Sequence, residues 1–334
     1  MKVLGVETSC DDTSMAIVEN GKLISMVRAT SEDFHKKYGG VVPEIAARKQ
    51  LEIFPYVIEE LEKKSGISIN QVEGVSVTIG PGLVGSLLVG VEFAKTLSYS
   101  LSIPLIGVNH LEGHIYSIFF DHDLKFPFLS LIISGGHTIL LIFEENFKYK
   151  FLGETVDDSA GEIIDKIGRK LGFDYPAGKA LDDLALKGDP KKYKFSIPKF
   201  KDKEKRYSFS FSGLKTEVLN VINKGDFKIE DLVSSMFYTI YESLMKKIEL
   251  AYEEFNINRV SVVGGVSASK FLRQFFSLNN NFEFYFPSFE FSTDNGGMIA
   301  LVGERYLLEG YFSDYDLDAV ASLKLNTNPY IKKN

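Results

Sequence analysis

Short apolar runs and amphipathic stretches alternate along the whole chain. The first three apolar runs have the length and composition of strands and lie at residues 3–7, 15–19 and 23–29. Polar residues 8–14 form a turn between the first two. The same layout returns later in three further runs, at residues 128–133, 138–143 and 149–154, with a small turn at 134–137. We therefore predict a duplicated domain in which each half opens with a hairpin.

Each hairpin is followed by helical and strand patterns in alternation. Apolar residues at helical spacing, among them Ile45, Val57 and Leu61, predict a helix over residues 44–63. Further helices are predicted over residues 83–98, 110–120, 160–171, 181–186, 231–255, 268–278 and 295–308. Further strands are predicted at residues 75–79, 105–108, 260–263 and 282–286. This alternation favours an α/β fold whose sheets are covered by helices on both faces.

The length of 334 residues fits two domains. We expect one lobe at residues 1–125, completed by residues 295–334, and a second lobe at residues 126–294 with a basic insertion at 187–216. A hydrophobic content of 45% with 25% charged residues is ordinary for a folded protein and excludes global disorder.

Composition also indicates the compartment. Cys10 is the single cysteine, so the chain forms no internal disulfide and a reducing environment is indicated. Acidic residues such as Glu7 lie too near the start for a signal peptide. The most apolar stretch, residues 83–101, contains Glu92 and Lys95 and is a poor membrane helix. We predict a soluble cytoplasmic protein with no membrane partner.

Charge is distributed unevenly. The net charge of −7 argues against a general polyanion binder, yet residues 187–206 hold nine basic and three acidic residues, a local net charge of +6. A solvated loop explains this stretch as well as a docking strip for a phosphate backbone does.

Three glycine-containing turns have the composition of phosphate-binding loops. Ser134, Gly135 and Gly136 leave backbone N–H groups open to a ligand, although a plain hairpin has the same composition. Gly264 and Gly265 end a strand and lead into a helix, a junction that suits a nucleotide. Residues 80–85 fit the dinucleotide-binding glycine pattern, but no acidic residue follows about twenty positions later, so a Rossmann fold is disfavoured.

His110 and His114 are the most specific local feature. Their i, i+4 spacing places both imidazoles on one helical face, where they suit a single metal ion. Glu112 stands one position too late for the metallopeptidase motif, so a peptidase is disfavoured. Asp294 is a candidate third ligand, and a helix N-cap is the alternative for it.

Other chemically capable residues are less informative on their own. Asp165 and Asp182 flank the turn at residues 175–178 and, taken alone, indicate surface carboxylates. Cys10 has no base near it in the sequence, which gives little support to a nucleophilic role.

Taken together, these motifs resemble one family. The segments that carry the resemblance are residues 6–13, 38–44, 80–85, 110–114, 134–138, 208–215 and 293–296, in that order. They resemble the TsaD family of tRNA adenosine threonylcarbamoyltransferases, once misnamed O-sialoglycoprotein endopeptidases. The resemblance implies the actin/Hsp70/sugar-kinase (ASKHA) fold, with duplicated RNase H-like lobes and a nucleotide cleft between them. No protein-kinase segment follows, so we expect the stand-alone bacterial form.

The resemblance also implies a reaction. The threonylcarbamoyl group of threonylcarbamoyl-AMP passes to the exocyclic amine of the adenosine beside the anticodon, in tRNAs that read codons beginning with A. His110, His114 and Asp294 would hold one divalent metal, iron by resemblance, with zinc or magnesium as alternatives.

By the same resemblance, substrate-binding residues are expected mainly in the second half. They are Ile132, Ile133, Ser134, Gly135, Gly136, Asp165, Gly178, Asp182 and Ser269. Ser269 stands where the family commonly has Asn, and Asp11 is a candidate general base. ATP or ADP would fit the same site. The implied partners are tRNA, a TsaB-type paralogue, a TsaE-type ATPase and a separate threonylcarbamoyl-AMP synthase.

Two alternatives stay open at this point. A small-molecule kinase of the same fold would use similar phosphate-binding turns but transfer a phosphoryl group from ATP. A nucleotide-gated subunit without catalysis is the non-enzyme alternative. A bound metal would discriminate the transferase from the kinase, because a sugar kinase needs no histidine pair and takes up Mg²⁺ with its nucleotide.

Overall fold

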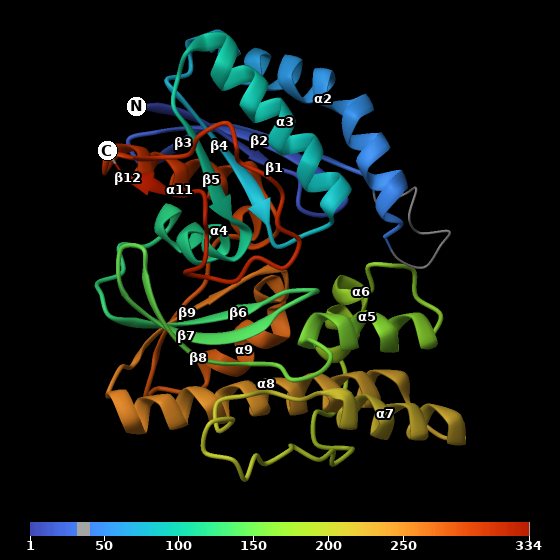
Figure 1. Ribbon diagram of the computed structural model, residues 1–334. Helices are drawn as coiled ribbons and strands as arrows, with labels where there is room; N and C mark the ends of the chain where they lie inside the picture. The colour runs from blue at the N-terminus through green and yellow to red at the C-terminus, as the bar shows by residue number, and fades with distance from the viewer. Residues whose placement is uncertain (32–40, 334) are drawn as a thin grey trace. The chain divides into compact units, whose positions relative to one another are not determined.

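The computed structural model describes residues 1–31 and 41–333, in two compact units (Figure 1). Unit 1 comprises Met1–Asp121 and Thr293–Asn334, and unit 2 comprises His122–Ser292. The chain thus passes between the units at 121/122 and 292/293, where the sequence suggested 125/126 and 294/295. Residues 38–40 of the motif at 38–44 lie outside the described residues.

Unit 1 is built on a five-stranded sheet in the order β3-β2-β1-β4-β5. Its strands are β1 (Lys2–Glu7), β2 (Asp12–Glu19), β3 (Lys22–Thr30), β4 (Gly74–Gly80) and β5 (Leu105–Asn109). The first three are antiparallel neighbours, whereas β1, β4 and β5 run parallel. β4 and β5 are buried along their whole length, as expected for parallel strands covered on both faces.

Helices cover both faces of this sheet (Figure 1). On one face lie α2 (Pro43–Ser65) and α3 (Val84–Leu101). On the other lie α4 (His110–Ser117) and α11 (Gly296–Leu308), which pack against each other. The remaining short elements of unit 1 are η1 (Ile69–Gln71), η2 (Ile118–Phe120), β11 (Tyr311–Phe312) and β12 (Lys332–Lys333).

Unit 2 repeats the topology of unit 1. Its strands are β6 (Phe128–Ile133), β7 (Thr138–Glu145), β8 (Lys148–Glu154), β9 (Arg259–Val263) and β10 (Glu283–Tyr285). They pair in the order β8-β7-β6-β9-β10, with the first three antiparallel and the last three parallel. Each strand therefore has a counterpart in unit 1, which confirms the predicted duplication.

The helices of unit 2 surround a core centred on the long helix α8 (Ile229–Phe255). The other helices are α5 (Ala160–Lys170), α6 (Gly178–Ala185), α7 (Ser212–Lys224), η3 (Gly265–Ala268), α9 (Lys270–Ser277) and α10 (Phe289–Ser292). Phe237, Tyr241 and Leu244 of α8 are fully or almost fully buried in that core. No helix among the described residues is long and apolar enough to cross a membrane.

Three helix predictions need correction. The predicted helix over residues 268–278 is two elements, because Ser269 caps α9 and the preceding residues form η3. The predicted helix over 110–120 stops being α-helical at Ser117 and continues as η2. Helix α7 was not predicted, although Leu214, Val218 and Ile222 recur at helical spacing; Leu214 and Val218 are its buried positions.

Helix α11 packs closely against β1, and this packing positions the residues at the start of the helix. A Cβ placed on Gly5 would overlap the carbonyl oxygen of Gly296 and the backbone nitrogen of Ala300. Only a residue without a side chain lets the helix rest on the strand at this distance. The start of α11, and the residues just before it, are therefore held against the sheet.

Replacing Gly5 by Ala should destabilise the protein by about 1–3 kcal/mol, because backbone atoms must move to admit the methyl group. Gly213→Ala is the matched control. Gly213 lies exposed in the first turn of α7, and a Cβ there would meet no described atom within 4 Å. That variant should be neutral or stabilising by up to about 1 kcal/mol. Urea unfolding of both variants makes the comparison, and equal midpoints would contradict the packing account.

Candidate metal centre and substrate-binding turns

Two buried imidazoles lie at the start of α4. The helix begins directly after β5, and Asn109 caps it by accepting a hydrogen bond from the backbone N–H of Leu111 at 2.9 Å. His110 is 7% exposed and His114 is fully buried. Their rings meet edge to face with centroids 4.7 Å apart, as the i, i+4 spacing predicts.

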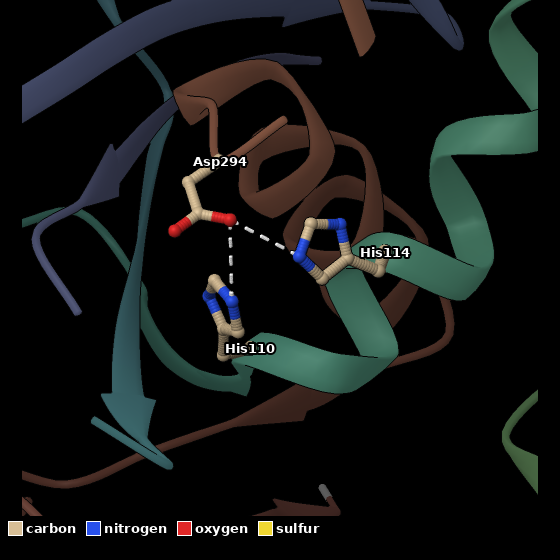
Figure 2. Close-up of side chains that lie close together, drawn as sticks. All are labelled: His110, His114 and Asp294. Carbon is tan, nitrogen blue, oxygen red and sulfur yellow. Dashed lines mark ion pairs between the residues drawn. The ribbon is translucent and has the colours of Figure 1, made fainter. Parts of the chain in front are cut away.

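Asp294 completes a cluster with these histidines (Figure 2). Its Oδ1 lies 3.1 Å from Nε2 of His114 and 3.5 Å from Nε2 of His110. One candidate ligand atom from each residue lies within 4.8 Å of the others. All three residues belong to unit 1, so the fold of that unit alone brings them together.

Asp294 does not cap the helix that follows it. Asn295 is the N-cap of α11, and its side chain accepts a hydrogen bond from the backbone N–H of Met298 at 2.8 Å. The N-cap alternative for Asp294 is therefore wrong. Its carboxylate is directed to the two imidazoles instead.

The far side of the His110 ring faces a second carboxylate. Nδ1 of His110 lies 3.0 Å from Oε2 of Glu7 and 3.1 Å from Oγ of Ser9. Burial lowers the pKa of His110, but the charges of Glu7 and Asp294 outweigh it and raise that pKa to about 9. Burial also acts to raise the pKa values of Glu7 and Asp294, and attraction to His110 brings both below their usual range. Two carboxylates thus hold a positive charge at His110.

The donor set fits a divalent cation. Neither ring nitrogen of His114 has a well-aligned hydrogen bond among the described residues, although both atoms are buried. A neutral imidazole carries one lone pair, so each of the two rings can offer one nitrogen to a cation. Two imidazole nitrogens and one carboxylate oxygen are the ligands of many zinc and iron sites.

Glu112 does not join this cluster. It is buried, and its carboxylate accepts a hydrogen bond from the hydroxyl of Tyr306 on α11 at 2.8 Å. This bond fastens α4 to α11.

The turn between β1 and β2 carries Cys10 and Asp11, and Asp12 is the first residue of β2. Asp11 lies on the wall of a cavity of about 440 Å³, together with Gln50 and Tyr56. Burial raises the pKa of the Cys10 thiol far above its usual value, so it is not a ready nucleophile. Burial likewise raises the pKa of Asp12 to about 6, against the opposing charge of Arg28.

In unit 2, the turn between β6 and β7 is open to a ligand. Ile132 and Ile133 are buried at the end of β6, and Oγ of Ser134 accepts a hydrogen bond from the backbone N–H of His137 at 3.1 Å. A Cβ on Gly135 or Gly136 would meet no described atom within 4 Å. The turn also contacts the start of α5, since Ser159 donates to the carbonyl of Gly135 at 2.7 Å.

Asp182 and Ser269 are bonded to each other. The Ser269 hydroxyl donates to Asp182, which also accepts from the backbone N–H of Lys270 at 2.8 Å. Tyr241 donates its hydroxyl proton to Ser269 at 3.0 Å. Asp182 is 7% exposed, so the surface-carboxylate interpretation is wrong for it.

Asp165 is half-buried and accepts a hydrogen bond from the backbone N–H of Ala177 at 2.9 Å. Burial raises the pKa of Asp165, and this effect outweighs the lowering by the hydrogen bonds from the backbone N–H groups of Ala177 and Gly178. Asp165 and Gly178 are therefore neighbours at the start of α6.

The segment at residues 208–215 is anchored by two acidic residues that the sequence did not single out. Asp157 accepts hydrogen bonds from the hydroxyl of Ser210 at 2.5 Å and from the backbone N–H of Phe211 at 2.8 Å. Asp158 pairs with Lys215, and with Lys166 at 2.7 Å. A double acidic residue at the end of a strand was the only sequence signal for this anchor.

The basic stretch at residues 187–206 lies between α6 and α7, mostly without regular structure. Arg206 pairs with Glu254. Four exposed lysines form no ion pair among the described residues: Lys199, Lys201, Lys203 and Lys205.

Comparison with known proteins places this arrangement in a family. The profile of TsaD, tRNA N6-adenosine threonylcarbamoyltransferase, matches residues 22–301. The protein of that name from Thermosipho africanus is 45% identical over 97% of this chain and 100% of its own length. Its namesake from a Sulfurihydrogenibium species is 42% identical over 100% of this chain and 99% of its own.

Solved structures share the fold at low sequence identity. HypF from T. kodakarensis has a TM-score of 0.66 at 14% identity, over 92% of this chain and 48% of its own. The activator of 2-hydroxyisocaproyl-CoA dehydratase from Clostridium difficile, solved with bound ADPNP, has a TM-score of 0.54 at 15% identity, over 92% and 96% of the two chains. These likenesses show the ASKHA fold alone. The family profile and the near full-length relatives go further: the chain belongs to the TsaD family of tRNA N6-adenosine threonylcarbamoyltransferases.

Proposed function

We propose that this protein transfers the threonylcarbamoyl group of threonylcarbamoyl-AMP to the exocyclic amine of the adenosine beside the anticodon, in tRNAs that read codons beginning with A. The observation that carries the proposal is the agreement with relatives of that name over nearly the whole chain, at 42–45% identity. The buried cluster of His110, His114 and Asp294 adds support. A sugar-kinase reaction gives no reason for such a cluster.

His110, His114 and Asp294 are the residues that would hold one divalent cation. The ion expected from the family resemblance is iron; two imidazoles with one carboxylate suit zinc as well, whereas magnesium prefers an all-oxygen set. When bound, the cation supplies positive charge that neutralises phosphate oxygens and improves AMP as a leaving group.

Unit 2 supplies the groups proposed to bind the nucleotide. The open turn at Ser134, Gly135 and Gly136 offers backbone N–H groups to phosphate oxygens. Asp165, Gly178, Asp182 and Ser269 would lie around the ribose or the acyl end. Because Ser269 is already bonded to Asp182 and Tyr241, its contact with a nucleotide would be shared or water-mediated. The same groups would accept ADP or ATP.

The chemical step itself needs positioning more than covalent help. The amine nitrogen attacks the carbamoyl carbon, the bond from that carbon to the phosphate oxygen breaks, AMP leaves and the amine loses one proton. Asp11, on the wall of the cavity in unit 1, is the proposed acceptor of that proton.

The proposed partners follow the family. They are the tRNA substrate, a TsaB-type paralogue, a TsaE-type ATPase and a synthase that supplies threonylcarbamoyl-AMP, in the cytoplasm. The exposed lysines at residues 199–205 are the proposed contact with the tRNA backbone.

Replacing both His110 and His114 by Ala should abolish metal binding and lower tRNA modification by at least about 100-fold, because charge neutralisation by a metal contributes several kcal/mol. The assay supplies threonine, bicarbonate, ATP, tRNA and the partner proteins, and elemental analysis measures the metal. His122→Ala is the control. The ring of His122 forms a hydrogen bond with the carbonyl of Phe286 in unit 2 and is not part of the cluster. Wild-type activity in the double variant would refute the metal role, and phosphoryl transfer to a small alcohol would favour the kinase alternative.

Reversing Lys199, Lys201, Lys203 and Lys205 to Glu should weaken tRNA binding and flatten its dependence on salt. Each lysine that no longer neutralises a phosphate lowers the slope of log K against log salt by roughly 0.7–0.9. The control reverses the same number of exposed lysines elsewhere: Lys22, Lys63, Lys64 and Lys148. Titrations at several salt concentrations make the measurement, and equal slopes for the two reversals would count against a docking strip.

A further inference from the structure

We propose that Glu7 is a positioning residue for the metal centre: its carboxylate holds the proton of His110 at Nδ1 and thereby presents Nε2 of that ring to the cation. The inference rests on the metal site of the proposed function, and it assigns a role to a residue outside the ligand set. Glu7 is the last residue of β1 and is 1% exposed.

Three hydrogen-bond donors converge on this carboxylate. Oε1 accepts from the backbone N–H of Ser9 at 2.6 Å. Oε2 accepts from the hydroxyl of Thr78 at 2.5 Å and lies 3.0 Å from Nδ1 of His110. An ionised carboxylate only accepts hydrogen bonds, so Nδ1 must be the donor in this last contact.

The position of that proton decides which nitrogen can bind a cation. A neutral imidazole carries one N–H, and a proton at Nδ1 leaves the lone pair on Nε2. Nε2 of His110 faces the same oxygen of Asp294 as Nε2 of His114 does, at 3.5 Å and 3.1 Å (Figure 2). The tautomer selected by Glu7 therefore directs the lone pair of His110 to the place that Nε2 of His114 also faces.

The two histidines are supported differently. Nδ1 of His114 has no hydrogen-bond partner among the described residues, and the ring is fully buried. His110 has Glu7, and Ser9 Oγ at 3.1 Å, on its Nδ1 side. A carboxylate behind a ligating imidazole fixes the ring and raises its basicity, and removal of such a partner typically weakens metal binding about 10–100-fold.

Glu7→Gln is a sharp variant because it preserves the shape of the side chain and reverses the two hydrogen bonds at Oε2, those with His110 and Thr78. The backbone N–H of Ser9 is fixed, so the amide oxygen of Gln turns toward it. The amide NH₂ then faces Nδ1 of His110 and donates to it. That arrangement places the ring proton on Nε2, where it blocks the ligand atom.

The matched control is Glu304→Gln. Glu304 is 2% exposed on α11 and accepts from the backbone N–H groups of Asn20 and Gly21 at 2.6 and 2.7 Å. Glu304→Gln therefore makes the same change of a buried carboxylate to an amide. Its hydrogen bonds go to the turn after β2 and not to either histidine.

Two measurements on the whole purified chain test the inference, with Zn²⁺ alone as a diamagnetic probe. Competition with a chromophoric chelator gives the affinity, and proton–nitrogen NMR of ¹⁵N-histidine-labelled protein detects the Nδ1 proton of His110. Glu7→Gln should bind zinc about 10–100-fold more weakly and lose the protected Nδ1 proton signal. Glu304→Gln should keep both. Should Glu7→Gln fail to fold, Thr78→Val carries the test, since it removes one of the two hydrogen bonds to Oε2 of Glu7 and should weaken zinc binding less strongly.

The outcomes separate this inference from the metal site itself. If wild-type protein binds zinc, His114→Ala abolishes binding, and the Glu7 or Thr78 variant matches wild type in affinity and in the Nδ1 signal, the positioning role is overturned and the site stands. If wild-type protein binds no zinc, and no iron under reducing conditions, the metal site fails and the inference falls with it.

Discussion

The contact between α11 and the sheet of unit 1 is the constraint on which the candidate site depends. At Gly5 the helix backbone rests directly on β1, and at Gly113 the side chains of Met298 and Ile299 pack against α4, less closely. The hydrogen bond between Tyr306 and Glu112 adds a third point of attachment. With α4 and α11 fixed in this way, Asp294 has little freedom to lie anywhere but beside the two imidazoles.

The electrostatics of the cluster favour a cation. Glu7 is a buried carboxylate and Asp294 a half-buried one, and their lowered pKa values keep both ionised beside one imidazolium at His110. Two negative charges thus surround one positive charge in a place of low dielectric. Burial of unbalanced charge is costly unless a further cation or hydrogen bonds compensate it. A divalent ion that replaces the His110 proton would supply that compensation, which connects the packing of unit 1 to the chemistry proposed for it.

The sequence predicted the structure best where the residues that determine a feature lie within one short segment. β6 was predicted with the observed bounds, since an apolar run lies between Pro127 and a glycine turn. The pairing of His110 with His114 follows from helical spacing alone. Asp294 was a candidate third ligand from the sequence, and the family resemblance then implied it as a ligand, although no local pattern relates it to α4.

Prediction failed where a residue's role depends on a distant partner. Asp182 looked like a surface carboxylate, yet its hydrogen bonds go to the start of α9, nearly ninety positions along the chain. Glu7 lies 103 positions from His110 and gave no sign of its contact. The sequence likewise gave no sign that Ser269 accepts a hydrogen bond from Tyr241, while its assignment to the nucleotide stays a prediction.

Anomalous X-ray diffraction at the metal edge of the purified protein tests the central claim most directly. The account predicts one ion per chain, at about 2.0–2.2 Å from Nε2 of His110, Nε2 of His114 and one oxygen of Asp294. An ion bound at other residues, or protein that stays metal-free after reconstitution with iron and with zinc, would contradict it.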